Sequence, residues 1–370
     1  MLDFDNIFDL PEGDEPEEEE YPDFYYEWDE AVTAGGKPRF YDQDELLEII
    51  EIYVSNREME KANQAIDYAI TFYPSDEDLP YDILEILSDY EMWNDLLTAC
   101  AKTKEQTGVW SGIYRLIALL HLGMEEEAFQ SFRSLKIKYI KDKDSLTDIY
   151  QCMAEALMDI DLYDSAVKVI EEGVKLHGGN SDDDWLLMRA YVSTFNKEKV
   201  KRQADRILKK MPLDGESWLA LGDAFFETGI WDRTIEAYEN AHSLGVYTQQ
   251  SKVHLVFCYE IEKSIDKAYE RAIEFLAENP DSYLFIIIAA KICSDAERWE
   301  EAIQHIDKAL ELSPGLNVLY FYKSFFLQNL EEYKKAKMVL MQGIEFTEDP
   351  EGSLARELEK LNEQFPDIKL

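Results

Sequence analysis

Side chains that could carry acid–base, metal or acyl-transfer chemistry are present in this chain of 370 residues, but their spacing supports none of these reactions. The five histidines are His121, His177, His242, His254 and His305. They form no HExxH or HxH pair, so we expect no metal site. Ser264 and Lys267 match an SxxK pattern, yet they fall in an expected turn and lack the other motifs of an acyl-transfer enzyme. No glycine-rich phosphate-binding motif occurs, and the sequence therefore predicts no enzyme and no cofactor.

Acidic residues dominate the composition, with 78 Asp and Glu against 37 Lys and Arg and a formal net charge of −41. Carboxylates are so frequent that close pairs of them carry no information about catalysis. The charge argues against nucleic acid as a partner, because binding there requires Lys and Arg to neutralise phosphates. It also disfavours an anionic membrane surface. A basic or amphipathic protein partner is compatible with this charge, and so is a purely solubilising role.

The cysteines and the amino terminus both indicate a reduced, cytoplasmic protein. The four cysteines show neither CxxC spacing nor the density of a disulfide framework. Residues 1–10 are acidic and lack the basic segment and apolar run of a secretion signal. The longest apolar run, residues 283–290, is too short to span a bilayer.

Residues 1–42 differ in composition from the rest of the chain. They contain 15 Asp and Glu against two Lys and Arg, whereas the remaining residues have a net charge of −28. Pro11, Pro16, Pro22 and the pair Gly35–Gly36 oppose a long helix. Such a segment buries too little apolar surface to offset its ordering entropy, so we expect an arm that is mobile in isolation or folds back. Five aromatic residues in this arm are candidate anchors for a partner: Tyr21, Phe24, Tyr25, Tyr26 and Trp28.

One pattern recurs at a fixed spacing in the second half of the chain. The small residues Thr234, Ala268, Ala302 and Ala336 follow one another at steps of 34 residues. Prolines and aromatic residues keep the same phase, namely Pro212, Pro280, Pro314, Trp231, Trp299 and Tyr333. Agreement between independent residue types indicates a structural repeat of this length.

The unit that starts at Gly215 carries the pattern W-x2-L-G-x2-F in Trp218, Leu221, Gly222 and Phe225. These side chains lie on one face of a helix, and the glycine lets the following helix approach closely. With the period of 34 residues, this pattern resembles the tetratricopeptide repeat family, in which helix-turn-helix units stack into a solenoid. The resemblance implies an all-α fold, a right-handed α-solenoid that ends in a capping helix.

Extending the phase in both directions predicts nine repeats over residues 43–350. They start near residues 43, 77, 109, 147, 181, 215, 249, 283 and 317. Two irregular spacings surround the third repeat, and residues 141–144 are the expected place for the extra residues. Residues 351–370 then supply the capping helix, which covers the apolar face of the last repeat.

The family resemblance implies that positions 2, 5, 9, 12 and 13 of each first helix line a concave groove that binds ligands. In the first four repeats these positions are largely acidic: Asp44, Glu51, Asp78, Glu85, Asp89, Asp148, Glu155 and Asp159. In the last three they are largely apolar, with one lysine: Val253, Phe257, Ile261, Leu284, Ile287, Lys291, Val318, Phe321 and Phe325. The family's carboxylate clamp needs Lys, Asn and Arg in the first repeats, and the acids found there disfavour it.

These observations predict a scaffold or escort that binds a segment of another protein in the groove. Two alternatives stay open. In the first, the acidic arm holds a highly basic client protein. In the second, the apolar groove is the interface of a homodimer or another homo-oligomer. The arm could also occupy the groove of its own chain until a client displaces it.

Overall fold

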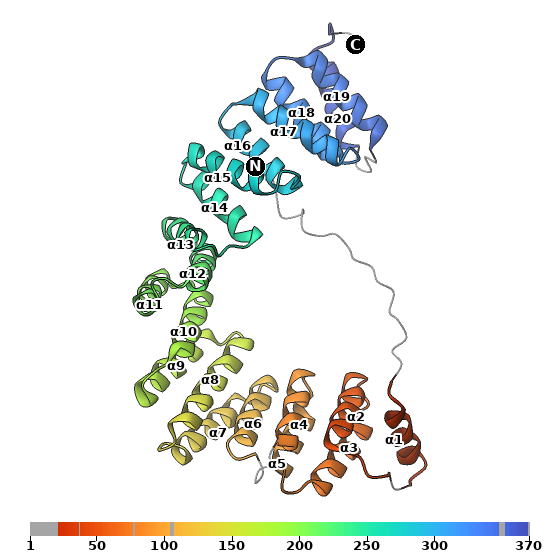
Figure 1. Cartoon of the computed structure of the whole chain (residues 1–370), viewed down its shortest axis with the longest axis vertical. Helices are drawn as coiled ribbons and strands as arrows, with labels where there is room; N and C mark the ends of the chain where they lie inside the picture. Colours follow the sequence, from red (N-terminus) through yellow and green to blue (C-terminus); the bar gives the residue numbers. More distant parts are fainter. Residues whose placement is uncertain (1–20, 37, 77, 104–106, 348–351, 369–370) are drawn as a thin grey trace. The chain divides into compact units, whose positions relative to one another are not determined.

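The computed structural model describes residues 21–36, 38–76, 78–103, 107–347 and 352–368. Within these ranges the chain forms twenty α-helices and no β-strand (Figure 1). The helices divide into two units, residues 1–179 and residues 180–370. None of the described helices combines the length and the apolar content needed to cross a bilayer.

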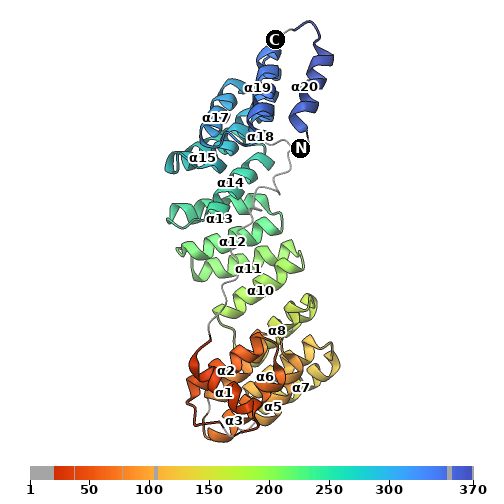
Figure 2. The ribbon, with the colours of Figure 1, turned by 90° about the vertical axis from the view of Figure 1, so that its right-hand side faces the viewer.

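The first unit contains a single helix followed by four helical hairpins. Its helices are α1 (Asp23–Thr33), α2 (Gln43–Ser55), α3 (Met59–Phe72), α4 (Asp78–Asp89), α5 (Trp93–Thr103), α6 (Trp110–His121), α7 (Glu125–Lys138), α8 (Lys143–Asp159) and α9 (Tyr163–His177). Within each hairpin the two helices pack against each other, and successive hairpins lie side by side (Figures 1 and 2). Buried residues such as Leu46, Ile83 and Tyr114 form one apolar core through the first three hairpins.

The second unit contains five hairpins and a final single helix. Its helices are α10 (Ser181–Ser193), α11 (Lys197–Lys210), α12 (Gly215–Glu227), α13 (Trp231–Ser243), α14 (Gln249–Ile261), α15 (Ile265–Glu278), α16 (Tyr283–Asp295), α17 (Trp299–Leu312), α18 (Asn317–Asn329), α19 (Tyr333–Phe346) and α20 (Ser353–Gln364). Ala268, Ala302 and Ala336, each in the first turn of its second helix (α15, α17 and α19), are fully buried. Their small size allows the helices of a hairpin to pack closely.

Helix α1 lies within residues 1–42, the arm that was expected to be mobile in isolation or to fold back. Trp28 is 1% exposed, and its ring makes edge-on contacts with Tyr41 and Tyr68 at centroid distances of 5.2 and 5.1 Å. Tyr25 is also buried, 5.2 Å from the ring of Tyr53. Two of the five candidate anchors are therefore core residues.

The acids of α1 are compatible with this packing because they lie on its outer face or are paired. Asp29 accepts hydrogen bonds from the hydroxyl of Tyr53 at 2.7 Å and from the ammonium of Lys61 at 2.8 Å. The Lys61 and Tyr53 hydrogen bonds outweigh the burial of Asp29 and lower the pKa of its carboxyl group. Of the remaining anchors, Tyr26 is exposed, and Tyr21 and Phe24 pack partly against the core. Residues 1–20 of the arm lie outside the described residues.

The extra residues between the third and fourth hairpins lengthen a helix. Helix α8 has 17 residues and begins at Lys143, four residues before the start expected at 147. The side chain of Asp142 caps it by accepting a hydrogen bond from the backbone N–H of Ser145. The predicted insertion is thus an added helical turn.

The first helix of every hairpin ends in the same backbone motif. Two residues after each of these helices, the chain enters the left-handed region with positive φ. The nine residues are Arg57, Glu91, Gly123, Asp161, Phe195, Gly229, Lys263, Glu297 and Glu331. The next backbone N–H then bonds a carbonyl five residues back, as from Glu58 to Tyr53 at 2.8 Å. This pair of features defines a Schellman motif.

Phe195 is expected to destabilise its hairpin. A left-handed conformation costs a residue with a Cβ about 1–2 kcal/mol, and glycine avoids this cost while losing more entropy on folding. Replacing Phe195, which is 71% exposed and has φ 50°, with glycine should therefore raise the free energy of unfolding by about 1 kcal/mol. Urea denaturation checks this result, and a loss of stability would show that the Phe195 side chain has stabilising contacts.

Helix α20 covers the last hairpin. Its Leu354 and Leu361 are buried in a cluster with Tyr320 and Leu340. The buried ammonium of Lys337 on α19 donates hydrogen bonds to the backbone carbonyls of Phe365 at 2.8 Å and Ile368 at 3.3 Å. A cation at the carboxyl end of a helix satisfies its free carbonyls and complements the helix dipole.

Candidate partner-binding surfaces

The acidic residues predicted to line a groove lie on α2, α4 and α8 of the first unit. All eight are exposed except Asp148, which is half-buried. Burial and the nearby carboxylates of Asp144 and Asp142 raise the pKa of Asp148. The pKa of Asp82 on α4 is raised in the same way, by burial and by Asp78 and Asp76. Burial is the larger cause of both shifts, and the neighbouring carboxylates add to it.

Three of the predicted acids meet in one cavity of about 460 Å³. It is lined by Ser88, Asp89, Glu91, Trp93, Ile117, His121, Cys152, Glu155, Ala156 and Asp159. Asp89 ends α4, and Glu155 and Asp159 lie on α8, so the cavity spans the second to fourth hairpins. We call it the acidic cavity. The other five predicted acids do not line it.

An aromatic pair forms part of the wall of the acidic cavity. The rings of Trp93 and His121 are stacked, with centroids 4.1 Å apart and an angle of 4° between their planes. Ile117 adds an apolar surface one turn before His121. Burial raises the pKa of the Cys152 thiol to about 12, so this group is uncharged at neutral pH. Among the described lining residues the charged side chains are four carboxylates, and neither Lys nor Arg is present.

Sequence reasoning missed part of this cavity. Trp93 begins α5 and Glu91 lies in the turn before it, so neither occupies a groove position of a first helix. His121 lies on α6, whose groove positions were not singled out because they are not acidic. A signal was available, because Trp93 lies at the same place in its repeat as Trp231 and Trp299.

The apolar residues predicted to line a groove in the second unit differ widely in exposure. Phe257, Ile261, Val318 and Phe325 are exposed. Val253, Leu284 and Phe321 are partly buried and pack against core clusters. Ile287 is 6% exposed, because α16 is apolar around most of its circumference and is packed between its neighbours. Ile287 therefore cannot contact a partner as expected.

Lys291 divides the apolar residues into two groups. Its ammonium is paired with the carboxylates of Glu260 on α14 and Asp295 on α16, the latter at 3.1 Å. Burial raises the pKa of Glu260, and hydrogen bonding to Lys291 acts against that rise. A charged triad consequently joins α14, the helix that carries Phe257, to α16.

Phe257 and Phe325 each belong to an aromatic patch that contains a tryptophan. Phe257 lies 6.3 Å from Trp231 and 6.0 Å from Phe226, measured between ring centroids. The ring of His254 stacks on Phe226 at 3.7 Å, and burial lowers the pKa of His254. The second patch joins Phe325 to Trp299, whose centroids are 6.3 Å apart. We call these groups the aromatic patches.

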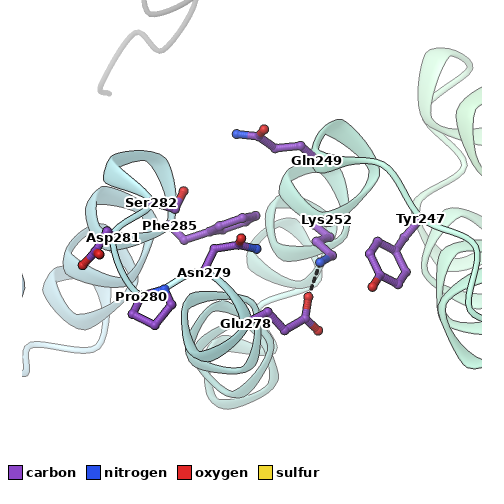
Figure 3. Close-up of a pocket in the computed structure, with 9 residues that line it drawn as sticks. All are labelled: Tyr247, Gln249, Lys252, Glu278, Asn279, Pro280, Asp281, Ser282 and Phe285. Carbon is purple, nitrogen blue, oxygen red and sulfur yellow. Dashed lines mark hydrogen bonds and ion pairs between the residues drawn. The ribbon is translucent and has the colours of Figure 1, made fainter.

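A second cavity, of about 550 Å³, lies between the start of α14 and the loop from α15 to α16 (Figure 3). Lys252 is buried there, paired with Glu278, and its ammonium lies 4.0 Å from the ring centroid of Tyr247. Lys252 occupies the place in its repeat that Trp218 holds in the preceding one. The lining mixes both charges with amides and Phe285, and the Lys252–Glu278 pair joins the ends of one hairpin.

Comparisons with known proteins agree with this architecture. No family model matches the chain. A curated TPR repeat-containing protein of Methanocaldococcus jannaschii is 24% identical over 50% of this chain, and the chain spans about a third (35%) of that protein's length. Among solved structures, the carboxyl-terminal part of a TPR repeat-containing protein from Cytophaga hutchinsonii has a TM-score of 0.50 and 17% identity, covering 66% of this chain and 98% of that one. A tetratricopeptide repeat protein from Parabacteroides merdae has a TM-score of 0.36 and 13% identity, covering 77% and 98%.

Proposed function

We propose that this chain, whose fold is that of tetratricopeptide repeat proteins, is a non-catalytic scaffold whose first unit binds a basic segment of a partner protein. The observation that carries the proposal is the acidic cavity, where four carboxylates surround a stacked Trp93–His121 pair. The partner would place a Lys or Arg side chain in this cavity.

The lining of the acidic cavity suits a long cationic side chain. The aliphatic stem of Lys or Arg can pack on Ile117 and Trp93 while its charged end remains among the carboxylates. The face of a tryptophan ring attracts a cation by about 0.5–2 kcal/mol, depending on how far the cation is desolvated.

The charge of the first unit supports the same class of partner. Residues 1–179 contain 14 Lys and Arg and 43 Asp and Glu, a net charge of −29, whereas residues 180–370 contain 23 and 35, a net charge of −12. A field of this sign raises the association rate of a basic partner and repels polyanions. Nucleic acids and anionic membranes are therefore disfavoured as ligands of this surface.

Neutralising Asp89 and Asp159 is expected to weaken binding of a labelled twelve-residue peptide rich in Lys and Arg by about tenfold or more. Each lost ion pair at a partly exposed site is worth up to about 1 kcal/mol, and 1.4 kcal/mol corresponds to a factor of ten. The matched control, Asp44→Asn with Asp78→Asn, removes the same charge outside the acidic cavity. Fluorescence anisotropy at two salt concentrations measures both variants.

The same experiment separates this proposal from its alternatives. Equal losses in the two double variants would contradict a specific site and indicate attraction by the overall charge alone. Loss of binding in a Phe257→Asp/Phe325→Asp variant, with little dependence on salt, would instead assign recognition to the aromatic patches. A change of molecular mass in that variant, measured by light scattering, would assign the patches to self-association.

A further inference from the structure

Helix α11 is strongly basic in a strongly acidic chain. Its 14 residues contain seven Lys and Arg and only two acids, Glu198 and Asp205. The basic residues are Lys197, Lys199, Lys201, Arg202, Arg206, Lys209 and Lys210. The buried face of the helix consists of Val200, Gln203, Ala204 and Ile207, so the bases lie on its sides and its outer face.

Contacts within the fold neutralise only part of this positive charge. Arg206 and Lys210 share a single carboxylate, that of the buried Asp184. Lys197 donates a hydrogen bond to the backbone carbonyl of Gly229 at 3.0 Å, which leaves its charge uncompensated. Asp205 is paired at 3.0 Å with Arg233, a residue of α13. The outer face of α11, with the exposed Arg202 and Lys209, therefore keeps an excess of positive charge.

Exposed apolar side chains stand at both ends of α11. Phe195 precedes the helix and Leu213 follows it, and Leu213 is 81% exposed. Phe195 is in the left-handed conformation, where six other hairpins place charged residues and two place glycine. The left-handed conformation disfavours a bulky residue, and the exposed Phe195 side chain gains no burial that would offset this cost. An interaction with another molecule better explains why phenylalanine occurs at this position.

We propose that the outer face of α11, together with Phe195 and Leu213, is a docking surface for an acidic segment of a partner protein. The complementary charge selects an acidic sequence, and the two flanking side chains select an apolar residue at each end. A helix of 14 residues is about 21 Å long, a length that six or seven extended residues span. The surface lies on the second helix of its hairpin and belongs to the second unit, so it is independent of the acidic cavity.

The test uses the full chain and a labelled synthetic peptide of eight residues, with phenylalanine first, six glutamates, and leucine last. We expect the Arg202→Glu/Lys209→Glu variant to bind it at least tenfold more weakly than the wild type. A matched control, Arg133→Glu/Lys138→Glu, reverses two exposed bases in another basic stretch, in the second half of α7, and should change binding less than twofold. Thermal unfolding of both variants verifies that they are folded.

The role of the apolar residues that flank α11 is tested separately. Phe195→Gly should weaken peptide binding severalfold even though it stabilises the fold. A peptide with serine at both ends should bind the wild type as weakly as the original peptide binds Phe195→Gly. Equal weakening in both charge-reversal variants would overturn the proposal, as would tighter binding of a short DNA duplex than of the peptide. Unchanged binding in Phe195→Gly would overturn the assignment of the flanking residues.

Discussion

Replacing Trp28 with alanine is expected to destabilise the amino-terminal repeats by about 3–5 kcal/mol. Removing a fully buried large aromatic side chain loses its transfer free energy and leaves a cavity. Trp28 is 1% exposed and makes edge-on ring contacts with both Tyr41 and Tyr68. Movement of neighbouring side chains into the cavity would not restore these ring contacts. The indole N–H of Trp28 has no hydrogen-bond partner, so the substitution breaks no hydrogen bond of this group, and relief of its unfavourable burial only partly offsets the loss of packing.

Hydrogen exchange resolved along the chain measures this effect, because in a repeat array the loss is confined to neighbouring hairpins. Protection should fall in α1 to α3 and remain unchanged in the second unit. Tyr26→Ala is the matched control, since Tyr26 lies two residues away on α1 and is 51% exposed. If Trp28→Ala were as mild as Tyr26→Ala, residues 23–33 would behave as the loose arm that their composition suggests.

Replacing Gly222 with alanine is expected to cost about 1–3 kcal/mol, a large effect for a single methyl group. An added Cβ would lie 2.4 Å from the ring of Tyr238, which is almost fully buried and cannot move aside freely. The hydroxyl of Tyr238 also donates to Asp223 at 2.7 Å and contacts His254 at 3.1 Å. Displacing the ring would therefore disturb both packing and hydrogen bonds between α12, α13 and α14.

Gly315→Ala provides the control for this substitution. No atom lies within 4 Å of a Cβ built at Gly315, and its φ is not positive. Reduced freedom of the unfolded chain should make that variant neutral or more stable by about 0.4–1 kcal/mol. Urea denaturation of both variants decides the matter, and equal stability would mean that Tyr238 can repack around the new methyl group.

The periodic part of the fold could be predicted because its signals are local and repeated. Small residues at steps of 34, such as Ala268, Ala302 and Ala336, are buried where two helices meet. Helix α1 could not be predicted in this way, because it occurs once and its acids suggested disorder. Its order depends on contacts with Tyr41, Tyr53 and Tyr68, which follow it in the sequence.

The candidate surfaces could be predicted only in outline. Asp89, Glu155 and Asp159 were assigned to groove positions, but the sequence did not indicate that these three would share a cavity. That convergence depends on how α4, α6 and α8 pack, which no single helix encodes. In the second unit, a largely apolar stripe that includes Lys291 was expected, and the sequence did not indicate that Glu260 and Asp295 would pair with this lysine.

The left-handed residue that ends each first helix has a consequence for how sequences of this kind diverge. The motif is closed by hydrogen bonds between main-chain atoms, so arginine, glutamate, aspartate, lysine and phenylalanine all occur at a place where glycine fits best. Each such replacement gives up a little stability, and none reopens the hairpin. The residue at this position can therefore vary from hairpin to hairpin while the backbone conformation of the turn stays the same.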